Sequence, residues 1–125
     1  MVGDVWPHVK GYIEAATDAA GDYTAESIER SLLNEDQLLW VIAEDKAILA
    51  AVVTELYETE REKVCNIVAC GGTELRRWRH LLPQLEDYAR AEGCATTRMA
   101  GRPGWQKVFP DYSVAFVTLE KKLEQ

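Results

Sequence analysis

The sequence lacks the long apolar runs and the positive charge that would place it in several broad classes of protein. It has no run of about 18 apolar residues, so we expect no transmembrane helix. Its first residues show no basic region followed by an apolar stretch, so we expect no signal peptide. Lys and Arg number 14 against 21 Asp and Glu, a net charge of −7. This balance argues against binding to nucleic acid or to an anionic membrane surface.

Residues suited to metal or nucleophilic chemistry are also sparse. The three cysteines, Cys65, Cys70 and Cys94, form no Cys-x-x-Cys pair, and we expect them to be reduced and packed in a core, as in a cytoplasmic protein. The two histidines, His8 and His80, lie far apart with no carboxylate at ligand spacing, so no metal site is expected. No serine stands in a Gly-x-Ser-x-Gly context, which leaves a hydrolase triad without support.

The 125 residues, 47% of them hydrophobic, are enough for one domain spanning 1–125. The pattern predicts a first helix that begins near Pro7 and a second helix capped by Thr24. Two β-rich runs, 37–43 and 47–57, are typical of a hairpin. A third strand at 64–69 is apolar on both faces, which indicates the centre of a sheet.

The second half of the chain continues the alternation of helices and strands. A Gly71–Gly72 turn is predicted to open a helix whose apolar stripe runs over 75–89, interrupted by Pro83. Strand 94–100, a short helix near 105–109 and a last strand at 113–119 follow. The order α-α-β-β-β-α-β-α-β predicts a mixed α/β layer fold, with parallel strands joined by a crossover between 64 and 100.

The junction after the central strand favours a ligand that carries phosphate. Free backbone N–H groups at a helix start suit phosphate, and Arg76, Arg77, Arg79 and His80 follow closely. A solvated basic helix face is the alternative interpretation.

This order and turn resemble the Gcn5-related N-acetyltransferase (GNAT) family over nearly the whole chain. The stretch Leu-Glu-Asp-Tyr-Ala-Arg-Ala-Glu-Gly-Cys at 85–94 looks like the end of the family's long helix. The segments Gln-Leu-Leu-Trp-Val, Ala-Cys-Gly-Gly and Gly-Arg-Pro-Gly-Trp resemble more narrowly a subgroup of short proteins encoded by bacteriophages and prophages; they lie at 37–41, 69–72 and 101–105.

The resemblance implies that acetyl-CoA lies where two parallel strands splay apart. It assigns the pyrophosphate to backbone N–H groups after the central strand, with cationic side chains beside them. The implied cofactor-binding residues are Val68, Ala69, Cys70, Gly71, Gly72, Thr73, Arg76 and Arg77. The family's usual loop has Gln or Arg, two residues, Gly, one residue, and Gly or Ala, and neither glycine register fits that pattern here.

Amine acetylation requires a base for the ammonium of the acceptor and an acid for the departing thiolate. The family often uses a Glu near the central strands and a Tyr in the late helix, which implicates Glu55 and Tyr112. A solvated Glu55 at an edge and a core-packed Tyr112 are the alternative interpretations, and Tyr57 is another candidate acid.

Three functions follow as hypotheses. The first is an acyl-CoA-dependent N-acetyltransferase that acts on a small-molecule or protein amine. The second is an inactive protein on the same scaffold that serves as a phage virion or assembly component, with other phage structural proteins as partners. The third is an inhibitor that binds a host protein through its acidic surface. The expected location is the cytoplasm, or a virion in the second case.

Overall fold

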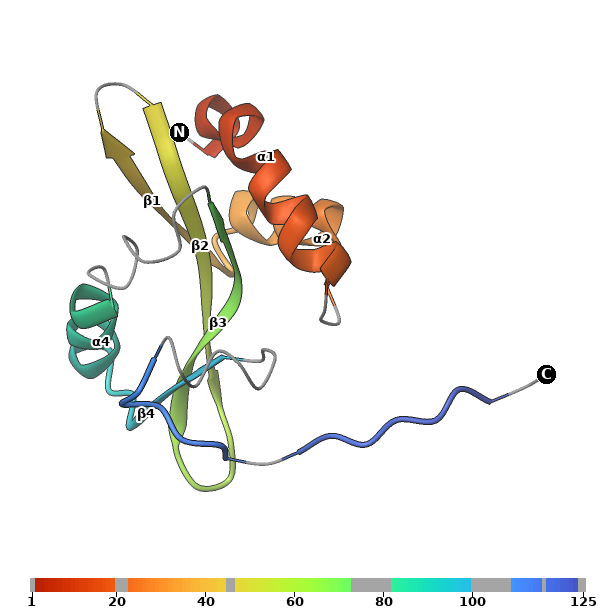
Figure 1. Cartoon of the computed structure of the whole chain (residues 1–125). Coiled ribbons are helices and arrows are strands. Elements are labelled where there is room, and N and C mark those ends of the chain that lie inside the picture. The colour runs from red at the N-terminus through yellow and green to blue at the C-terminus, as the bar shows by residue number, and fades with distance from the viewer. Residues whose placement is uncertain are drawn as a thin grey trace.

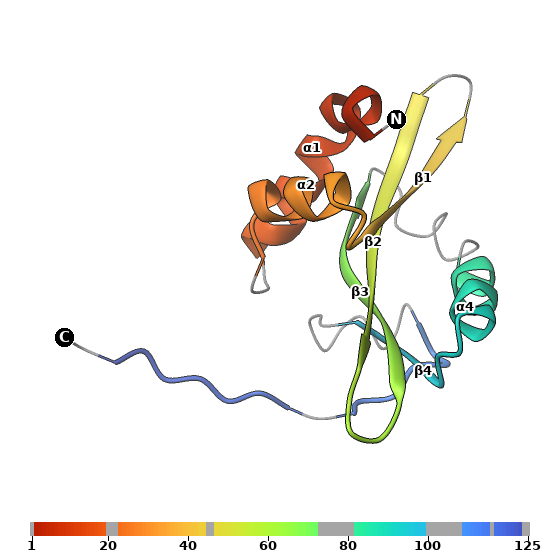
Figure 2. The same cartoon turned by 180° about the vertical axis from the view of Figure 1, so that it is seen from behind.

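A computed structural model describes residues 2–19, 23–44, 47–72, 82–99, 109–115 and 117–123. A single four-stranded sheet in the order β1-β2-β3-β4 forms the centre, and helices pack on both of its faces. Helices α1 and α2 lie on one face and α4 on the other (Figures 1 and 2). The β1–β2 and β2–β3 pairs are antiparallel, and β3–β4 is parallel. The predicted mixed α/β fold is confirmed.

Helix α1, Val2–Ala19, begins before Pro7, so the predicted start at Pro7 is wrong. The first N–H groups of a helix have no partner within it, so proline is tolerated there. Pro7 lies inside α1, just beyond these first residues. Its inner face packs on the sheet: Val9 and Ile13 are fully buried, and Tyr12 packs beside them.

Helix α2, Ala25–Leu33, starts as predicted at the N-cap Thr24. The backbone N–H of Ser27 donates to Oγ1 of Thr24, and the backbone N–H of Thr24 donates to Oγ of Ser27. This reciprocal pair satisfies N–H groups that the helix start leaves open. Ile28 and Leu32 are buried as expected, whereas Leu33 is exposed.

Strands β1, Leu38–Glu44, and β2, Ala47–Glu58, form the predicted hairpin. Strand β2 is the longest of the sheet and pairs on both sides, with β1 and with β3. Its side chains alternate between the faces: Ala51 and Val53 pack against α1 and α2, whereas Ala50 and Val52 pack on the α4 side.

Strand β3, Lys63–Gly72, is longer than predicted, and the predicted Gly71–Gly72 turn is wrong. Both glycines are paired strand residues, Gly71 opposite Ala51 and Gly72 opposite Ala50. A Cβ on Gly71 would lie 2.6 Å from the carbonyl oxygen of Tyr12, and one on Gly72 would lie 2.5 Å from that of Leu49. These glycines therefore allow close backbone packing against α1 and β2.

Helix α4 is described over Leu82–Ala91 and contains Pro83 near the start of that range; the part of the predicted stripe at 75–81 lies outside the described residues. Gly93 ends the helix with a φ of 85°, and the N–H of Cys94 donates to the carbonyl of Ala89 as in a Schellman cap. Strand β4, Thr96–Met99, is shorter than the predicted 94–100.

The predicted last strand at 113–119 is wrong for this structure. The described residues from 109 to 123 contain no strand, and the segment extends away from the sheet in both views (Figures 1 and 2). Most of the predicted short helix at 105–109 lies outside the described residues.

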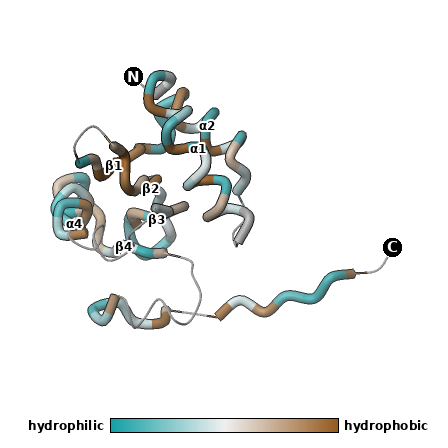
Figure 3. Tube along the Cα trace, turned by 45° about the horizontal axis from the view of Figure 1, so that its top comes forward, coloured by the Kyte–Doolittle hydropathy of each residue, from teal (hydrophilic) through white to brown (hydrophobic). Residues whose placement is uncertain are grey.

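Two apolar clusters hold the sheet between its helices. One joins α1 and α2 to Ala51, Val53 and Ala69, and the other joins α4 and Phe109 to Val52 and Ile67. Hydrophobic residues accordingly concentrate along β1, β2 and the part of α1 that faces them (Figure 3). In the described ranges no helix combines the length and apolarity needed to cross a bilayer.

The substitution Gly71→Ala should lower the free energy of unfolding by about 1–3 kcal/mol, because the added methyl overlaps the backbone of Tyr12. Urea unfolding measures this change. The matched control is Gly11→Ala in the middle of α1, where a Cβ meets nothing within 4 Å and where alanine should add about 0.5–1 kcal/mol. Equal stability of the two variants would contradict the close packing at Gly71.

Candidate functional site

Strands β3 and β4 run side by side over the four residues of β4. Their parallel pairing covers Val64–Thr96 through Ile67–Met99, whereas β3 continues to Gly72. Within the described residues, positions 68–72 of β3 therefore have no partner on the β4 side. We call this stretch of β3 and the space beside it the notch.

A β-bulge in β3 directly follows its last described pair with β4. In the β2–β3 register Val53 pairs with Ala69 and Thr54 with Ile67, so Val68 is the extra residue. Val68 and Ala69 both pack on the α1/α2 side. A bulge bends its strand and increases the local twist. The bulge therefore changes the course of β3 at the start of the notch.

The sequence-predicted cofactor residues fall into two groups. Val68, Ala69, Cys70, Gly71 and Gly72 all lie in β3 along the notch. Thr73, Arg76 and Arg77 lie outside the described residues, so their assignment stays a prediction.

The buried cysteines of β3 are held in the thiol form. Burial raises the pKa of Cys70 to about 12, and burial, with a smaller contribution from Cys94, raises that of Cys65 to about 11. A thiolate is the reactive species, so neither side chain is prepared for nucleophilic chemistry. The expected role in core packing is confirmed for both, since each is at most 8% exposed.

Glu55, the predicted base, lies on the α1/α2 side of β2 at the centre of a polar cluster. The Tyr23 hydroxyl donates to its Oε1 at 2.8 Å, Asn66 Nδ2 donates to Oε1 at 3.1 Å, and Gln37 Nε2 donates to Oε2 at 3.1 Å. We call these four residues the Glu55 cluster. The three donors lie just before α2, just before β1 and in β3, and together they fix the carboxylate in one orientation.

Gln37 is the most enclosed member of the Glu55 cluster. Its side chain is 5% exposed, and its Oε1 has no hydrogen-bond partner. A buried acceptor without a partner costs free energy, so its presence requires an explanation. The cluster thus combines a fixed carboxylate with a spare carbonyl oxygen beside it.

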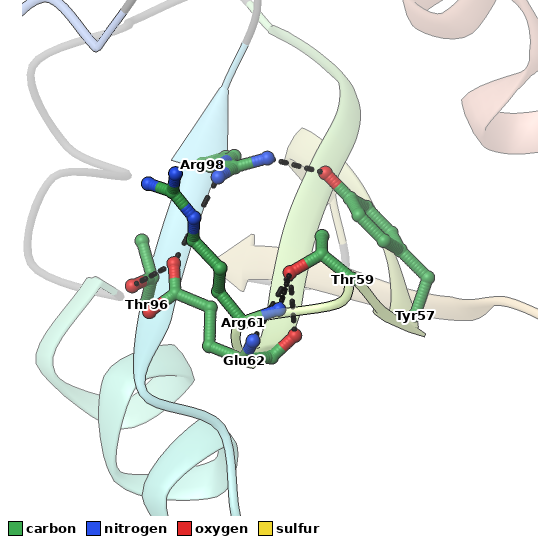
Figure 4. Close-up of polar contacts among 6 residues, drawn as sticks. All are labelled: Tyr57, Thr59, Arg61, Glu62, Thr96 and Arg98. Carbon is green, nitrogen blue, oxygen red and sulfur yellow. Dashed lines mark hydrogen bonds and ion pairs between the residues drawn. The ribbon is translucent and has the colours of Figure 1, made fainter.

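A second cluster of polar side chains, which includes Tyr57, Glu62 and Arg98, lies toward β4 on the same face (Figure 4). Arg98 Nη1 donates to the Tyr57 hydroxyl at 3.3 Å, and its Nη2 lies 3.8 Å from Oε1 of Glu62. Thr96 Oγ1 donates to the same Glu62 oxygen at 2.8 Å. Thr59, which accepts from the N–H groups of Arg61 and Glu62, shapes the β2–β3 turn that supports Glu62.

The predicted acid, Tyr112, lies on the α4 side. Its hydroxyl donates to Oε2 of Glu86 at 3.0 Å and is 2.8 Å from Oγ1 of Thr97. Burial, reinforced by Glu86 and opposed by the Thr97 hydrogen bond, raises its pKa to about 12. Tyr112 also contacts Phe109 edge to face, which supports the core-packing interpretation as well.

The two predicted catalytic residues therefore lie on opposite faces of the sheet. Glu55 bonds to Tyr23 beside α2, whereas Tyr112 packs on the cluster that contains α4. The structure does not bring them into contact. The structure instead brings Glu55 together with Asn66. Asn66 pairs with Arg98 of β4, directly before the last described β3–β4 pair, Ile67–Met99.

The sequence analysis did not identify most partners of Glu55, nor the cluster of Arg98 with Tyr57 and Glu62. Asn66 gave a signal, since it interrupts the otherwise apolar predicted strand 64–69, and it pairs directly with Glu55. Gln37, Glu62 and Arg98 gave none, because their role depends on the register between distant strands. No group of three or more His, Cys, Asp or Glu in the described parts of the chain could hold a metal ion.

Comparisons with known proteins identify the fold. A probable acetyltransferase aligns over 99% of this chain and 93% of its own, with a TM-score of 0.67 and 16% identity. Glucosamine-6-phosphate N-acetyltransferase from Arabidopsis thaliana aligns over 99% of this chain and 95% of its own, with a TM-score of 0.63 and 19% identity. A predicted acetyltransferase with acetyl-CoA from Clostridium acetobutylicum aligns over 81% of this chain and 71% of its own, with a TM-score of 0.57 and 15% identity.

The chain therefore has the GNAT acetyltransferase fold, which confirms the predicted architecture. No protein-family model matches the sequence. A search of curated proteins also finds no match.

Replacing Glu55 with alanine should lower the free energy of unfolding by about 1–3 kcal/mol, because Tyr23, Gln37 and Asn66 lose their acceptor. Denaturant unfolding at neutral pH measures the change. Glu58→Ala, at an exposed end of β2, is the matched control and should change stability by about 0.5 kcal/mol or less. A similar loss in both variants would contradict a central role of Glu55 in the cluster.

Tyr112 should make the protein less stable at high pH. Because folding raises its pKa from 10.0 to about 12, its neutral form is favoured in the folded state. The associated stability is fully present below pH 10 and is lost as the pH rises toward 12. Tyr112→Phe should lack this part of the decline. Unfolding free energies of both proteins across that range test the expectation, and parallel curves would contradict it.

Proposed function

We propose that the protein is a GNAT-type N-acetyltransferase that transfers an acetyl group from acetyl-CoA to an amine. The observation that carries the proposal is the notch: in an acetyltransferase fold, residues 68–72 of β3 continue past the last β3–β4 pair of the described residues. Fold alone does not fix an activity. The notch adds a place where the chain leaves strand hydrogen-bonding groups open among its described residues.

The residues of the notch fit the pantetheine arm of acetyl-CoA. That arm carries two amide groups, and an extended amide-containing ligand can add to an open strand edge through main-chain hydrogen bonds. Residues 68–72 of β3 offer such an edge. The solved structure from Clostridium acetobutylicum contains acetyl-CoA in a protein of the same fold. The pyrophosphate contacts proposed for Thr73, Arg76 and Arg77 await the binding test below.

Acetyl-CoA supplies an acyl group on a thioester, which an uncharged amine can attack. Glu55 is the proposed base and accepts the proton of the acceptor ammonium, directly or through one water. The donors Tyr23, Gln37 and Asn66 hold its carboxylate in place.

Tyr112 is the proposed acid. Its hydroxyl is protonated at neutral pH, as a proton donor must be, but the raised pKa makes it a weaker acid than a free tyrosine, so the proposal rests on its position and not on its pKa. Its position opposite Glu55 is compatible with this role, because a ligand in the notch passes between two strands and meets both faces of the sheet. The amine then approaches from the α1/α2 side, and the thiolate leaves toward the α4 side.

The acceptor, whether a small molecule or a protein, and a cytoplasmic location stay predictions. The proposed phage subgroup and the inactive virion or host-binding alternatives also gain no support from the matched structures. An enzyme on this fold is the function that the described site supports best.

Calorimetric titration with acetyl-CoA tests the proposal, and we expect saturable binding at micromolar to millimolar concentration. Arg76→Ala combined with Arg77→Ala should weaken binding at least tenfold, whereas the control pair Lys121→Ala and Lys122→Ala, on the exposed segment, should leave it unchanged. Absence of heat with acetyl-CoA and with CoA at millimolar concentration would refute the proposed function.

Thiol release in the presence of a panel of amines then tests catalysis. Glu55→Gln should lower kcat by about 10²–10⁴-fold at neutral pH with a smaller effect on acetyl-CoA affinity, as expected for a lost base. Tyr112→Phe should lower kcat in the same direction. Full activity of both variants would exclude these roles, even if the cofactor binds.

A further inference from the structure

The two oxygens of the Glu55 carboxylate have different surroundings. Oε1 accepts from the Tyr23 hydroxyl at 2.8 Å and from Asn66 Nδ2 at 3.1 Å. Oε2 accepts from Gln37 Nε2 at 3.1 Å, which is its only hydrogen bond among the described residues. Each carboxylate oxygen has about two lone-pair sites. Both sites of Oε1 are therefore used, and Oε2 is the oxygen of Glu55 that has room to take up a proton.

Gln37 lies beside this oxygen, and its backbone is held in place. Its N–H donates to the carbonyl oxygen of Ser31 at 3.3 Å, directly before β1 begins at Leu38. Its side chain is buried, and Oε1 has no hydrogen-bond partner in the described parts of the chain. The change of contacts that disturbs this packing least is a half-turn of the amide, because it exchanges an oxygen and a nitrogen of similar size.

The observed orientation of the Gln37 amide follows from the charge of Glu55. An ionised carboxylate only accepts hydrogen bonds, so the amide turns its Nε2 toward Oε2. A protonated carboxyl group instead carries an O–H donor, which requires the amide oxygen as its partner. The amide leaves one of its two groups without a partner in either state. This accounts for the buried acceptor without a partner that the structure shows.

We propose that Gln37 is a positioning residue that holds Glu55 in both of its protonation states. The proposal rests on the function proposed above, in which Glu55 takes a proton from the acceptor ammonium. In that step an N–H bond breaks, its electron pair stays on the nitrogen, and the proton forms an O–H bond at Oε2. The Gln37 amide then turns so that its Oε1 accepts from this O–H, and it turns back when the proton passes to solvent.

Other charged groups lie near the Glu55 cluster and have to be separated from Glu55 in a titration. Toward β4 these are Arg98, which pairs with Asn66, and Glu62, which lies 3.8 Å from Arg98. On the helix side they are Glu14 of α1 and Glu26 of α2, which line a groove together with Tyr23. Arg98 keeps its charge throughout, so the neighbouring carboxyl groups are the ones that a control variant has to address.

Carbon NMR of the full chain, with labelled side chains of glutamine and glutamate, tests the proposal without acetyl-CoA. As the pH is lowered, the Cδ resonance of Gln37 should move downfield, because its oxygen gains a donor. The midpoint of this movement should equal that of the Glu55 carboxyl resonance. Glu55→Gln should abolish the movement, whereas Glu26→Gln, which removes a nearby carboxyl group outside the cluster, should leave it unchanged.

The titration separates this proposal from the proposed function. A Gln37 resonance that stays still while Glu55 takes up its proton would overturn the turning amide. A Glu55 that stays ionised until acid unfolds the protein would overturn it too, because a second amide orientation then has no use. Coupled movement in a protein that binds no acetyl-CoA would support the turning amide and refute the acetyltransferase.

Turnover measurements then test whether the amide contributes to the reaction. Gln37→Met should lower kcat about tenfold and change the KM for acetyl-CoA by less than about threefold, because Oε2 loses its contact. Tyr23→Phe is the matched control, since it removes one donor from Oε1 and leaves Asn66 in place; it should lower kcat by less than about threefold. An equal loss of kcat in both variants would overturn the assignment of Oε2 and Gln37.

Discussion

The bulge at Val68 in β3 is the constraint on which the rest of the described structure depends. Four residue pairs, Val64–Thr96 through Ile67–Met99, hold β3 and β4 together in parallel, and the bulge follows directly after the last of these pairs. Strand β2 pairs with β3 on its other side out to Gly72. Among the described residues, β3 is therefore paired on both sides up to Ile67 and on the β2 side alone from Val68 to Gly72.

Polar side chains lie on both faces of the sheet near the β3–β4 pairs. Glu55, Asn66 and Arg98 occupy neighbouring positions on β2, β3 and β4, on the face that carries α1 and α2. Tyr112 and Glu86 lie on the other face beside Thr97. The sheet therefore separates Glu55 from Tyr112, so the proposal that both act on one ligand requires that ligand to reach both faces.

Much of the fold followed from local patterns in the sequence. Thr24 before an apolar stripe and the two β-rich runs of the hairpin each carry a signal that needs no distant partner, and the structure confirmed both. The Gly71–Gly72 pair misled because glycine serves turns and close packing equally well. Only the position of Tyr12 on α1 shows which of the two applies. The site was harder to predict, since the partners of Glu55 come from three separate stretches of sequence and depend on the register of the sheet.

The contacts of the two glycines decide which side of the notch can yield. Gly71 lies against the backbone of α1, and Gly72 lies against that of β2, so the end of β3 is enclosed on its α1 face and on its β2 edge. Strand β4 is held by four pairs with β3 and by the side-chain hydrogen bonds of Thr96 with Glu62 and of Thr97 with Tyr112. The β2 edge and the α1 face of β3 therefore cannot move apart from β3 without loss of backbone packing, whereas β4 depends on these few contacts.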